Sequence, residues 1–192
     1  HSRPYDVPYN LRKPMQAEIS DAIHAGVLTP CNTTSKWVHQ MFPVPKAGKN
    51  EVRLCSDFKR LNSAIERPVY PTESNSQILR HVPPDSKYFV SFDMTSGYHQ
   101  CLVHPEDREL LTVICQYGRF RFNCLSQGIT STSDFFNYLS DGDLRWAKCW
   151  ERLLKNMDDV MMGAPTLQAL EEMIAEFLLS CKAKNIKLKP SK

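Results

Sequence analysis

Three aspartates follow or interrupt apolar stretches of this chain, where an acidic side chain needs a partner. Asp158 and Asp159 are adjacent within the apolar segment 156–162, and Asp93 ends the apolar run that begins at Tyr88. Adjacent carboxylates repel each other and acids are depleted from strands, so a divalent cation would relieve both conflicts. One or two hard cations bound by three carboxylates support in-line phosphoryl transfer to a hydroxyl group. The alternative is a surface turn that happens to carry two acids.

The elements around these aspartates are predicted to bring them together. Residues 153–163 are interpreted as strand, turn and strand with the acidic pair at the turn, and a separate strand delivers Asp93. A hairpin turn beside the end of another strand places all three carboxylates at one edge of a sheet. Magnesium keeps several waters and accepts substrate phosphates, so few protein ligands are needed. Two such ions about 4 Å apart would activate the attacking hydroxyl and hold the leaving group.

A basic hairpin could bind phosphates. Lys46 and Arg53 flank the turn between two predicted strands, residues 38–44 and 52–56. A lysine ammonium acts as a point charge and an arginine guanidinium as a bidentate donor, and both suit a triphosphate. Two solvent-exposed hairpin charges are the alternative interpretation.

Small residues follow Asp93 directly. Thr95, Ser96 and Gly97 allow backbone N–H groups to approach phosphates closely. Tyr98 comes next and could place its ring beneath a bound sugar. A core aromatic at this position is the alternative.

A second glycine follows Gln127. Gly128 allows a tight turn, and the Gln127 amide can hydrogen-bond to a nucleotide or a template base. A plain loop before the next helix is the alternative interpretation.

The remaining pattern indicates an α+β fold, because hairpins alternate with crossing helices. Thr166 is predicted to cap a last helix that ends near Asn185. The buried face of this helix is predicted from its spacing to contain Leu167, Leu170, Ile174, Phe177, Leu178 and Cys181. The other predicted elements are an extended lead-in over residues 1–12, helices over 14–28, 76–82, 130–139 and 144–154, and a hairpin over 110–123 that turns at Tyr117-Gly118.

The composition is that of a globular domain. The 192 residues are 42% hydrophobic and 23% charged, which suffices for a real core. Apolar runs stay well below the roughly 18 residues of a membrane span, and the polar, proline-rich start is unlike a signal peptide. Seven cysteines without a C-x-x-C pair predict reduced thiols in an intracellular protein, rather than disulfides or a zinc site.

Positive charge is unevenly distributed along the chain. The net charge is only +3, yet residues 36–67 contain seven basic and three acidic side chains. From Lys182 onward there are five lysines and no acid. These clusters predict either a groove that faces a polyanion or two ordinary solvated faces.

Together these blocks resemble the reverse transcriptases of retroviruses and LTR retrotransposons, most closely the Gypsy-like group. The resemblance keeps the family's order over nearly the whole chain. The matching blocks are residues 26–28 with 35–37, 52–62 ("VR..vDyR.LN"), 92–100 ("LD..SGYHQ"), 125–129, 157–159 (the core of "Y-x-D-D") and 187–192.

The resemblance implies the right-hand polymerase fold, with an antiparallel palm sheet backed by helices and with the thumb absent. The implied fingers are residues 1–68 and 101–131, and the implied palm is residues 69–100 and 132–192. The thumb and RNase H regions would be other parts of the same polyprotein.

The resemblance also implies a role for each candidate residue. Asp93, Asp158 and Asp159 would be the catalytic ligands of two Mg²⁺ ions, which Mn²⁺ can replace. Lys46 and Arg53 would contact the triphosphate, and the backbone of Thr95, Ser96 and Gly97 would lie near the phosphates. Tyr98 would be the steric gate against a 2′-hydroxyl. Gln127 would contact the nucleotide, and Met157 would lie near the primer terminus.

The implied reaction adds a dNMP from a dNTP to a primer 3′-OH on an RNA or DNA template. The implied location is intracellular, in the cytoplasm, a retroelement particle or the nucleus, without membrane contact. An RNA-templated RNA polymerase is a distant alternative, disfavoured by Tyr98 at the gate position.

Three departures from the family pattern support a rival interpretation. Asn156 replaces the usual tyrosine, Ser126 replaces the usual proline, and residues 141–155 do not match the family. The rival is a degenerate or host-adopted retroelement domain that binds nucleic acid or protein without catalysis.

Overall fold

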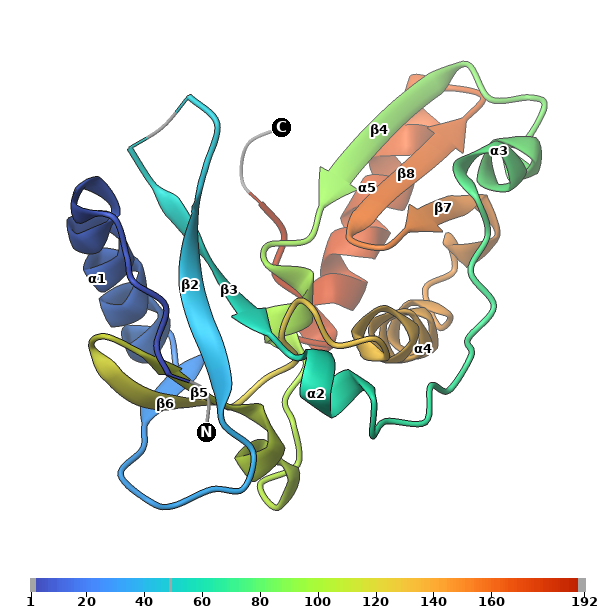
Figure 1. The fold of residues 1–192 in the computed structure, drawn as a ribbon. Coiled ribbons are helices and arrows are strands. Elements are labelled where there is room, and N and C mark those ends of the chain that lie inside the picture. Colours follow the sequence, from blue (N-terminus) through green and yellow to red (C-terminus); the bar gives the residue numbers. More distant parts are fainter. Residues whose placement is uncertain (1–2, 49, 190–192) are drawn as a thin grey trace. The chain divides into compact units, whose positions relative to one another are not determined.

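The computed structural model describes residues 3–48 and 50–189, which form two compact units built from alternating chain segments (Figure 1). The first unit is His1–Arg67 with Cys101–Thr132, and the second is Pro68–Gln100 with Ser133–Lys192. The chain therefore crosses between units after Arg67, Gln100 and Thr132, compared with 68, 100 and 131 in the predicted division. The names fingers and palm for these units stay predictions.

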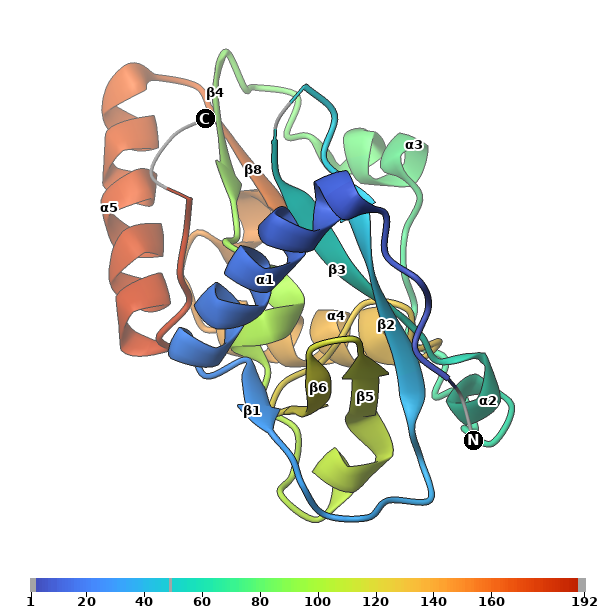
Figure 2. The same ribbon diagram turned by 60° about the vertical axis from the view of Figure 1, so that its left-hand side comes forward.

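In the described residues, the first unit contains a five-stranded sheet in the order β1-β6-β5-β2-β3. Its neighbours pair antiparallel except for β2 and β5, which are parallel. Helix α1 (Tyr9–His24) packs against β1, β2 and β3 (Figure 2), and the short helix α2 (Lys59–Asn62) follows β3. The strands are β1 (Leu28–Pro30), β2 (His39–Pro45), β3 (Val52–Asp57), β5 (Thr112–Cys115) and β6 (Gly118–Phe122).

The second unit contains a three-stranded antiparallel sheet, within the described residues, in the order β4-β8-β7. Helix α5 (Leu167–Ala183) packs against β4 and β8, and α4 (Thr132–Leu144) leads into the unit from the first one. The strands are β4 (Tyr88–Asp93), β7 (Leu153–Asn156) and β8 (Asp159–Ala164), with the short helix α3 (Asn75–Ile78) before β4. The predicted antiparallel sheet with helices behind it is confirmed.

Four 3₁₀ helices complete the described structure. One follows α3 directly, one lies in the connection after β4, and the other two immediately precede β5 and β7. They are Leu79–His81, Gly97–Gln100, Asp107–Leu111 and Trp150–Arg152.

The start of the chain differs from its prediction. Pro14 was expected at the first turn of a helix, but α1 begins at Tyr9 and includes Pro14 in its interior. The predicted extended lead-in is therefore wrong from Tyr9 onward, and the predicted helix end at Leu28 is wrong because the helix ends at His24. Gly26 has a φ of +72°, which ends the helix and lets Leu28 begin β1.

The predicted helix over 144–154 is also wrong. Helix α4 ends at Leu144, a 3₁₀ turn follows at Trp150–Arg152, and β7 begins at Leu153. Trp146 is 83% exposed, so its helical spacing with Trp150 does not produce a buried face. The apolar run of β7 instead finds its partner in β8, a contact that local spacing cannot reveal.

The last helix matches most of its prediction. The Thr166 hydroxyl accepts a hydrogen bond from the Ala169 N–H at 3.2 Å, so the predicted N-cap is confirmed. Leu170, Phe177 and Cys181 are buried as expected, whereas Leu167 and Leu178 are 55% and 44% exposed. The buried stripe is thus narrower than predicted, because only one side of α5 faces the sheet.

The predicted hairpin over 110–123 is confirmed as β5 and β6. Its turn lies one residue earlier than expected, because Cys115 pairs with Gly118 and Gly118 already belongs to β6.

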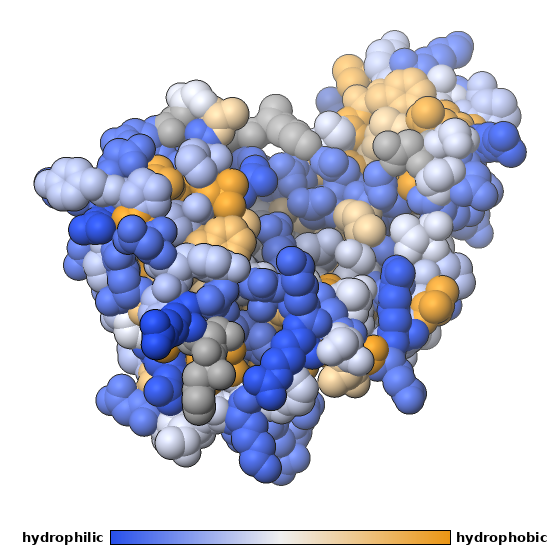
Figure 3. All heavy atoms as spheres, viewed as in Figure 1, coloured by the Kyte–Doolittle hydropathy of each residue, from blue (hydrophilic) through white to orange (hydrophobic). Residues whose placement is uncertain are grey.

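The surfaces of both units are mainly hydrophilic on the face shown in Figure 3, with apolar side chains in separate patches. Within the described residues, helices of the length and apolarity needed to cross a membrane are absent.

All seven cysteines are free thiols, and burial raises the pKa of Cys124 to about 12 and that of Cys181 to about 11.

Candidate active site

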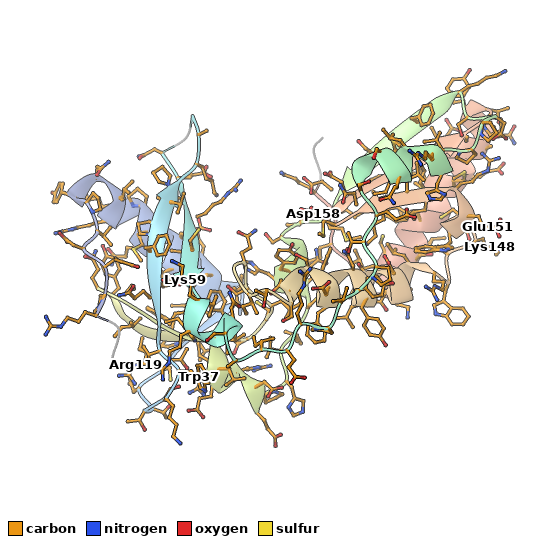
Figure 4. All side chains as sticks on the ribbon, turned by 45° about the vertical axis from the view of Figure 1, so that its right-hand side comes forward. Trp37, Lys59, Arg119, Lys148, Glu151 and Asp158 are labelled. Carbon is orange, nitrogen blue, oxygen red and sulfur yellow. The ribbon has the colours of Figure 1, made fainter. Side chains whose placement is uncertain are left out.

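The backbones of the three predicted aspartates come together at one end of the second unit's sheet. Asp93 at the end of β4 pairs with Asp159 at the start of β8, and the Met94 N–H donates to the Asp158 carbonyl at 2.8 Å. Asp159 also pairs with Asn156, which leaves Met157 and Asp158 as a two-residue turn. Figure 4 shows Asp158 at the opposite end of this unit from Glu151. The expected meeting of strand end and hairpin turn is confirmed.

The carboxylates differ in exposure and in their partners. Asp158 and Asp159 are exposed, whereas the Asp93 side chain is only 16% exposed. The Lys189 ammonium lies 3.4 Å from Asp93 Oδ2, and the Lys189 N–H donates to the Asp93 carbonyl at 2.8 Å. A cationic group is therefore already accommodated at this edge, where three negative charges would otherwise face one another.

The donor set suits a hard cation in an open site. Over residues 3–48 and 50–189, groups of three His, Cys, Asp or Glu side chains close enough to enclose one ion do not occur. Two exposed carboxylates beside a half-buried third one nevertheless offer the oxygen ligands that Mg²⁺ prefers. Because Mg²⁺ keeps waters and takes phosphate oxygens from substrates, these residues fit an ion whose shell is completed by other ligands.

Gly97 brings the loop after Asp93 close to the acidic turn. A Cβ at position 97 would lie 2.8 Å from Phe136 Cζ and 3.5 Å from Asp158 Cβ, so a larger residue there would require the Phe136 ring to shift. Ser96 has a φ of +48°, which marks a tight change of direction before it. The backbone of this loop thus passes directly beside Asp158. Its contact with phosphates stays a prediction.

Gln100 fixes the chain's last described segment to this loop. Its Nε2 donates to the carbonyls of Thr95 at 2.6 Å and Lys187 at 2.9 Å, and its Oε1 accepts from the Lys187 N–H at 2.8 Å. Leu188 forms a β-bridge with Met94. Of the family-like block 187–192, residues 190–192 lie outside the described residues.

Tyr98 is anchored at both ends of its side chain. Its hydroxyl lies 3.1 Å from Ser133 Oγ, and its ring packs edge-on against Phe136 with centroids 5.3 Å apart. The ring is half-buried, so one part of it packs inside the unit and the other part reaches the surface.

The basic residues Lys46 and Arg53 belong to the first unit. Lys46 follows β2 directly and pairs with Glu51 at 3.0 Å, and its side chain is 30% exposed. Arg53 is exposed on β3, opposite Val44. The hairpin between β2 and β3 therefore presents two cationic side chains near its turn, as the sequence predicted.

Gln127 lies exposed in a loop of the first unit that Asn62 holds. Asn62 donates to the Gly128 carbonyl at 2.8 Å and accepts from the Thr130 N–H at 3.0 Å. Gly128 has a φ of +95°, and a Cβ there would lie 3.2 Å from the Ser56 carbonyl oxygen. Glycine is therefore required both by conformation and by space.

The candidate residues thus form two sets, each described within its own unit. Lys46, Arg53 and Gln127 lie in the first unit. The second unit contains Asp93, Thr95, Ser96, Gly97, Tyr98, Met157, Asp158 and Asp159.

Sequence reasoning missed the roles of Asn62, Gln100 and Lys189. Asn62 and Gln100 stand inside the recognised blocks, so a search for amides near glycines could have found them. Lys189 belongs to the lysine-rich end of the chain and to the family-like block 187–192, but neither pattern predicts its contact with Asp93.

Comparison with known proteins places these features in a family. The family model described as "Reverse transcriptase (RNA-dependent DNA polymerase)" matches residues 44–192. The chain is 27% identical over 148 residues to the Retrovirus-related Pol polyprotein from transposon opus of Drosophila melanogaster, covering 76% of this chain and 15% of that protein. It is also 27% identical over 148 residues to the corresponding polyprotein from transposon gypsy of the same organism, covering 76% and 14%.

A solved structure shows the same fold. The foamy viral protease-reverse transcriptase dRH in complex with ds DNA superposes with a TM-score of 0.87 at 16% identity, covering 98% of this chain and 32% of that one. The chain thus spans only about a seventh of the length of the polyproteins that it resembles.

Proposed function

The chain belongs to the reverse transcriptase (RNA-dependent DNA polymerase) family, and we propose that the protein containing it adds dNMPs to a primer 3′-OH on an RNA or DNA template. The proposal depends chiefly on one observation. The backbones of Asp93, Asp158 and Asp159 lie at one end of the sheet, where Asp93 is the strand partner of Asp159 and the Met94 N–H donates to the Asp158 carbonyl.

The carboxylates would hold two Mg²⁺ ions, which Mn²⁺ can replace. When bound, such ions lower the pKa of the primer hydroxyl and stabilise the charge on the departing pyrophosphate. The chain's own part is to fix the ligands: strand pairing sets Asp93 against Asp159, and the Met94 N–H holds the Asp158 backbone. Lys189 would leave Asp93 when the ions bind, because an ammonium and a metal ion compete for the same carboxylate.

The remaining candidate residues would bind the substrates. We assign Lys46 and Arg53 to the triphosphate, the backbone of Thr95 to Gly97 to nearby phosphates, and Gln127 to the nucleotide. Tyr98 would exclude a 2′-hydroxyl, and its anchoring on Ser133 and Phe136 supports a fixed ring that could do so. Met157, at the turn beside Asp158, would lie at the primer terminus.

The units and partners follow from the same proposal. The first unit would be the fingers and the second the palm, with thumb and RNase H regions elsewhere in a polyprotein. The opus and gypsy relatives are Pol polyproteins, and a structural relative was solved with ds DNA. These relatives support a retroelement polyprotein that binds nucleic acid, and the use of a primer and dNTPs inside the cell belongs to the proposed reaction.

A non-catalytic nucleic-acid-binding or protein-binding module is the alternative. It is favoured by Asn156 in place of the family's tyrosine and by the Lys189 ammonium at Asp93. An inert site could keep the ion pair permanently.

Primer extension on poly(rA)/oligo(dT) with Mg²⁺ or Mn²⁺ tests the proposal. The chain should extend the primer, and an Asp158→Asn, Asp159→Asn double variant should lose at least about 10³-fold in rate, since the metal ligands are removed. Asp143→Asn, an exposed acid in the same unit, is the matched control and should leave the rate unchanged. Neither extension nor Mn²⁺ binding by the unaltered chain would favour the non-catalytic module.

A further inference from the structure

A buried ion pair lies behind the acidic hairpin. Lys155 is on β7 with a side chain only 6% exposed, and its ammonium lies 2.9 Å from Asp141 Oδ1 on α4. The Tyr70 hydroxyl donates to Asp141 Oδ2 at 2.9 Å. Because desolvation offsets much of the attraction, a buried pair is a poor source of stability and is better explained by the geometry that it enforces.

The ammonium fixes the orientation of a neighbouring amide. Lys155 Nζ also donates to Asn137 Oδ1 at 2.9 Å, and Asn137 is 4% exposed. An ammonium can only donate, so the oxygen of Asn137 must face Lys155 and its NH₂ group must face the other way. There the NH₂ group contacts Thr72 Oγ1 at 3.3 Å and Met157 Sδ at 3.5 Å.

Met157 is the residue of the turn that most needs support. Its φ is +54°, a conformation that residues with side chains rarely adopt. Its backbone neighbours are Asn156, which pairs with Asp159, and Asp158, which binds Met94. Holding the Met157 side chain therefore restrains the turn from a second direction.

The same cluster touches the loop on the other side of the site. The Lys155 ammonium lies 5.6 Å from the centroid of the Phe136 ring. The same ring would be in steric conflict with a side chain at position 97. Lys155 thus lies behind both the turn that carries Asp158 and the loop that follows Asp93.

We propose that Lys155 is a positioning residue: held by Asp141, it orients the Asn137 amide so that this amide holds Met157 and sets the Met157–Asp158 turn. The consequence for catalysis rests on the proposed polymerase function. The contact chain itself does not, and can be measured without activity.

Methyl NMR of the chain labelled with ¹³C-methyl methionine tests the contact chain. The Met157 signal is assigned by its loss in Met157→Leu. In a Lys155→Leu, Asp141→Leu double variant, which leaves no unpaired charge, the Met157 signal should shift. A Lys184→Leu, Asp143→Leu double variant removes an exposed ion pair of the same unit (3.4 Å) and should leave the signal in place. An unchanged Met157 signal in the first variant would overturn the proposal.

Asn137→Leu separates positioning from general stability. This variant should shift the Met157 signal on its own, and adding the Lys155→Leu, Asp141→Leu changes should shift it no further. A further shift of similar size would show that Lys155 acts independently of Asn137 and would also overturn the proposal.

Primer extension then measures the consequence in folded protein, with folding checked by thermal melting. The Lys155→Leu, Asp141→Leu variant and Asn137→Leu should each lower kcat about tenfold, and the triple variant should lower it no more. Extension with an unchanged kcat would overturn the positioning role while leaving the polymerase proposal intact. Should the unaltered chain not extend primers, the NMR shifts alone decide the positioning role.

Discussion

The two units differ in the side chains that lie behind their candidate residues. In the described residues of the first unit, the core beneath the sheet is one apolar cluster that includes Met15, Met41, Phe58 and Val113. In the second unit, Asp134, Asn137 and Ser140 are buried together with the Lys155 side chain, on α4 and β7 behind the acidic turn.

This difference shows how each unit can present its candidate residues. Apolar packing is non-directional, and a sheet built on it suffices to carry exposed charges such as Lys46 and Arg53. Hydrogen bonds and ion pairs are directional, so a polar interior can specify the position of a turn more narrowly. The second unit also has fully buried apolar side chains, such as Val160, Met162 and Phe177, and its polar cluster contacts the Met157–Asp158 turn through Asn137.

The largest expected effect is on the apolar core of the first unit. Phe58 is 1% exposed and packs against His39 and Phe122, with ring centroids 4.8 Å and 6.3 Å away. Phe58→Ala should lower the free energy of unfolding of this unit by about 3–5 kcal/mol, because it removes the ring and leaves a cavity. Hydrogen exchange of the β2 and β3 amides measures this. Tyr9→Ala, at an 84% exposed position, is the control and should change little.

The next effect tests the polar interior of the second unit. Lys155→Leu alone should lower the free energy of unfolding by about 3 kcal/mol, because Asp141 is then buried without its cation. The double variant Lys155→Leu, Asp141→Leu should recover most of that loss, since two apolar groups need no partner. Urea unfolding of both variants measures the difference. If both variants lost the same free energy of unfolding, the ion pair itself would stabilise the unit, and the cost would not come from the unpaired Asp141 carboxylate.

A smaller effect is expected at the exposed hairpin of the first unit. Lys46 pairs with Glu51 at 3.0 Å, and the two side chains are 30% and 53% exposed. Lys46→Met should change the free energy of unfolding by less than about 1 kcal/mol, because solvent already screens the pair. The same variant should raise KM for the dNTP, the role proposed for this ammonium. A loss of more than that would contradict the expected contrast between the exposed Lys46–Glu51 pair and the buried Lys155–Asp141 pair.

The smallest effect is a pH dependence of the first unit. His39 is 2% exposed, and burial lowers its pKa below the usual 6.5, opposed in part by hydrogen bonds to the Leu110 and Asp57 backbones. Between the two pKa values, His39 is protonated in the unfolded chain but neutral in the folded chain. The free energy of unfolding should therefore fall as the pH drops through 6.5 toward the lower pKa of the folded state.

Urea midpoints between about pH 7.5 and 5.5, a range of roughly one unit either side of the ordinary histidine pKa, would measure this slope. His39→Gln should flatten it. An equal slope in both proteins would assign the pH dependence to other groups.

Much of the fold could be predicted because the signals were local. Alternation and turn residues located the β2–β3 hairpin, the β5–β6 hairpin and the acidic turn, and a hydroxyl at Thr166 marked the start of α5. The predicted start of the first helix at Pro14 and the predicted helix over 144–154 were wrong, because proline also occurs inside helices and a local apolar run does not reveal its strand partner.

For the candidate site, the sequence by itself determined which residue types are present and that Asp93 ends a strand while Asp158 lies in a turn. The assignments of metal ligands and substrate contacts stay predictions. Only the tertiary structure decided that Asp93 pairs with Asp159, that Lys189 lies at Asp93, and that Lys155 meets Asp141. These contacts join residues that are distant in the chain, so their energies depend on strand pairing and burial that no local pattern encodes.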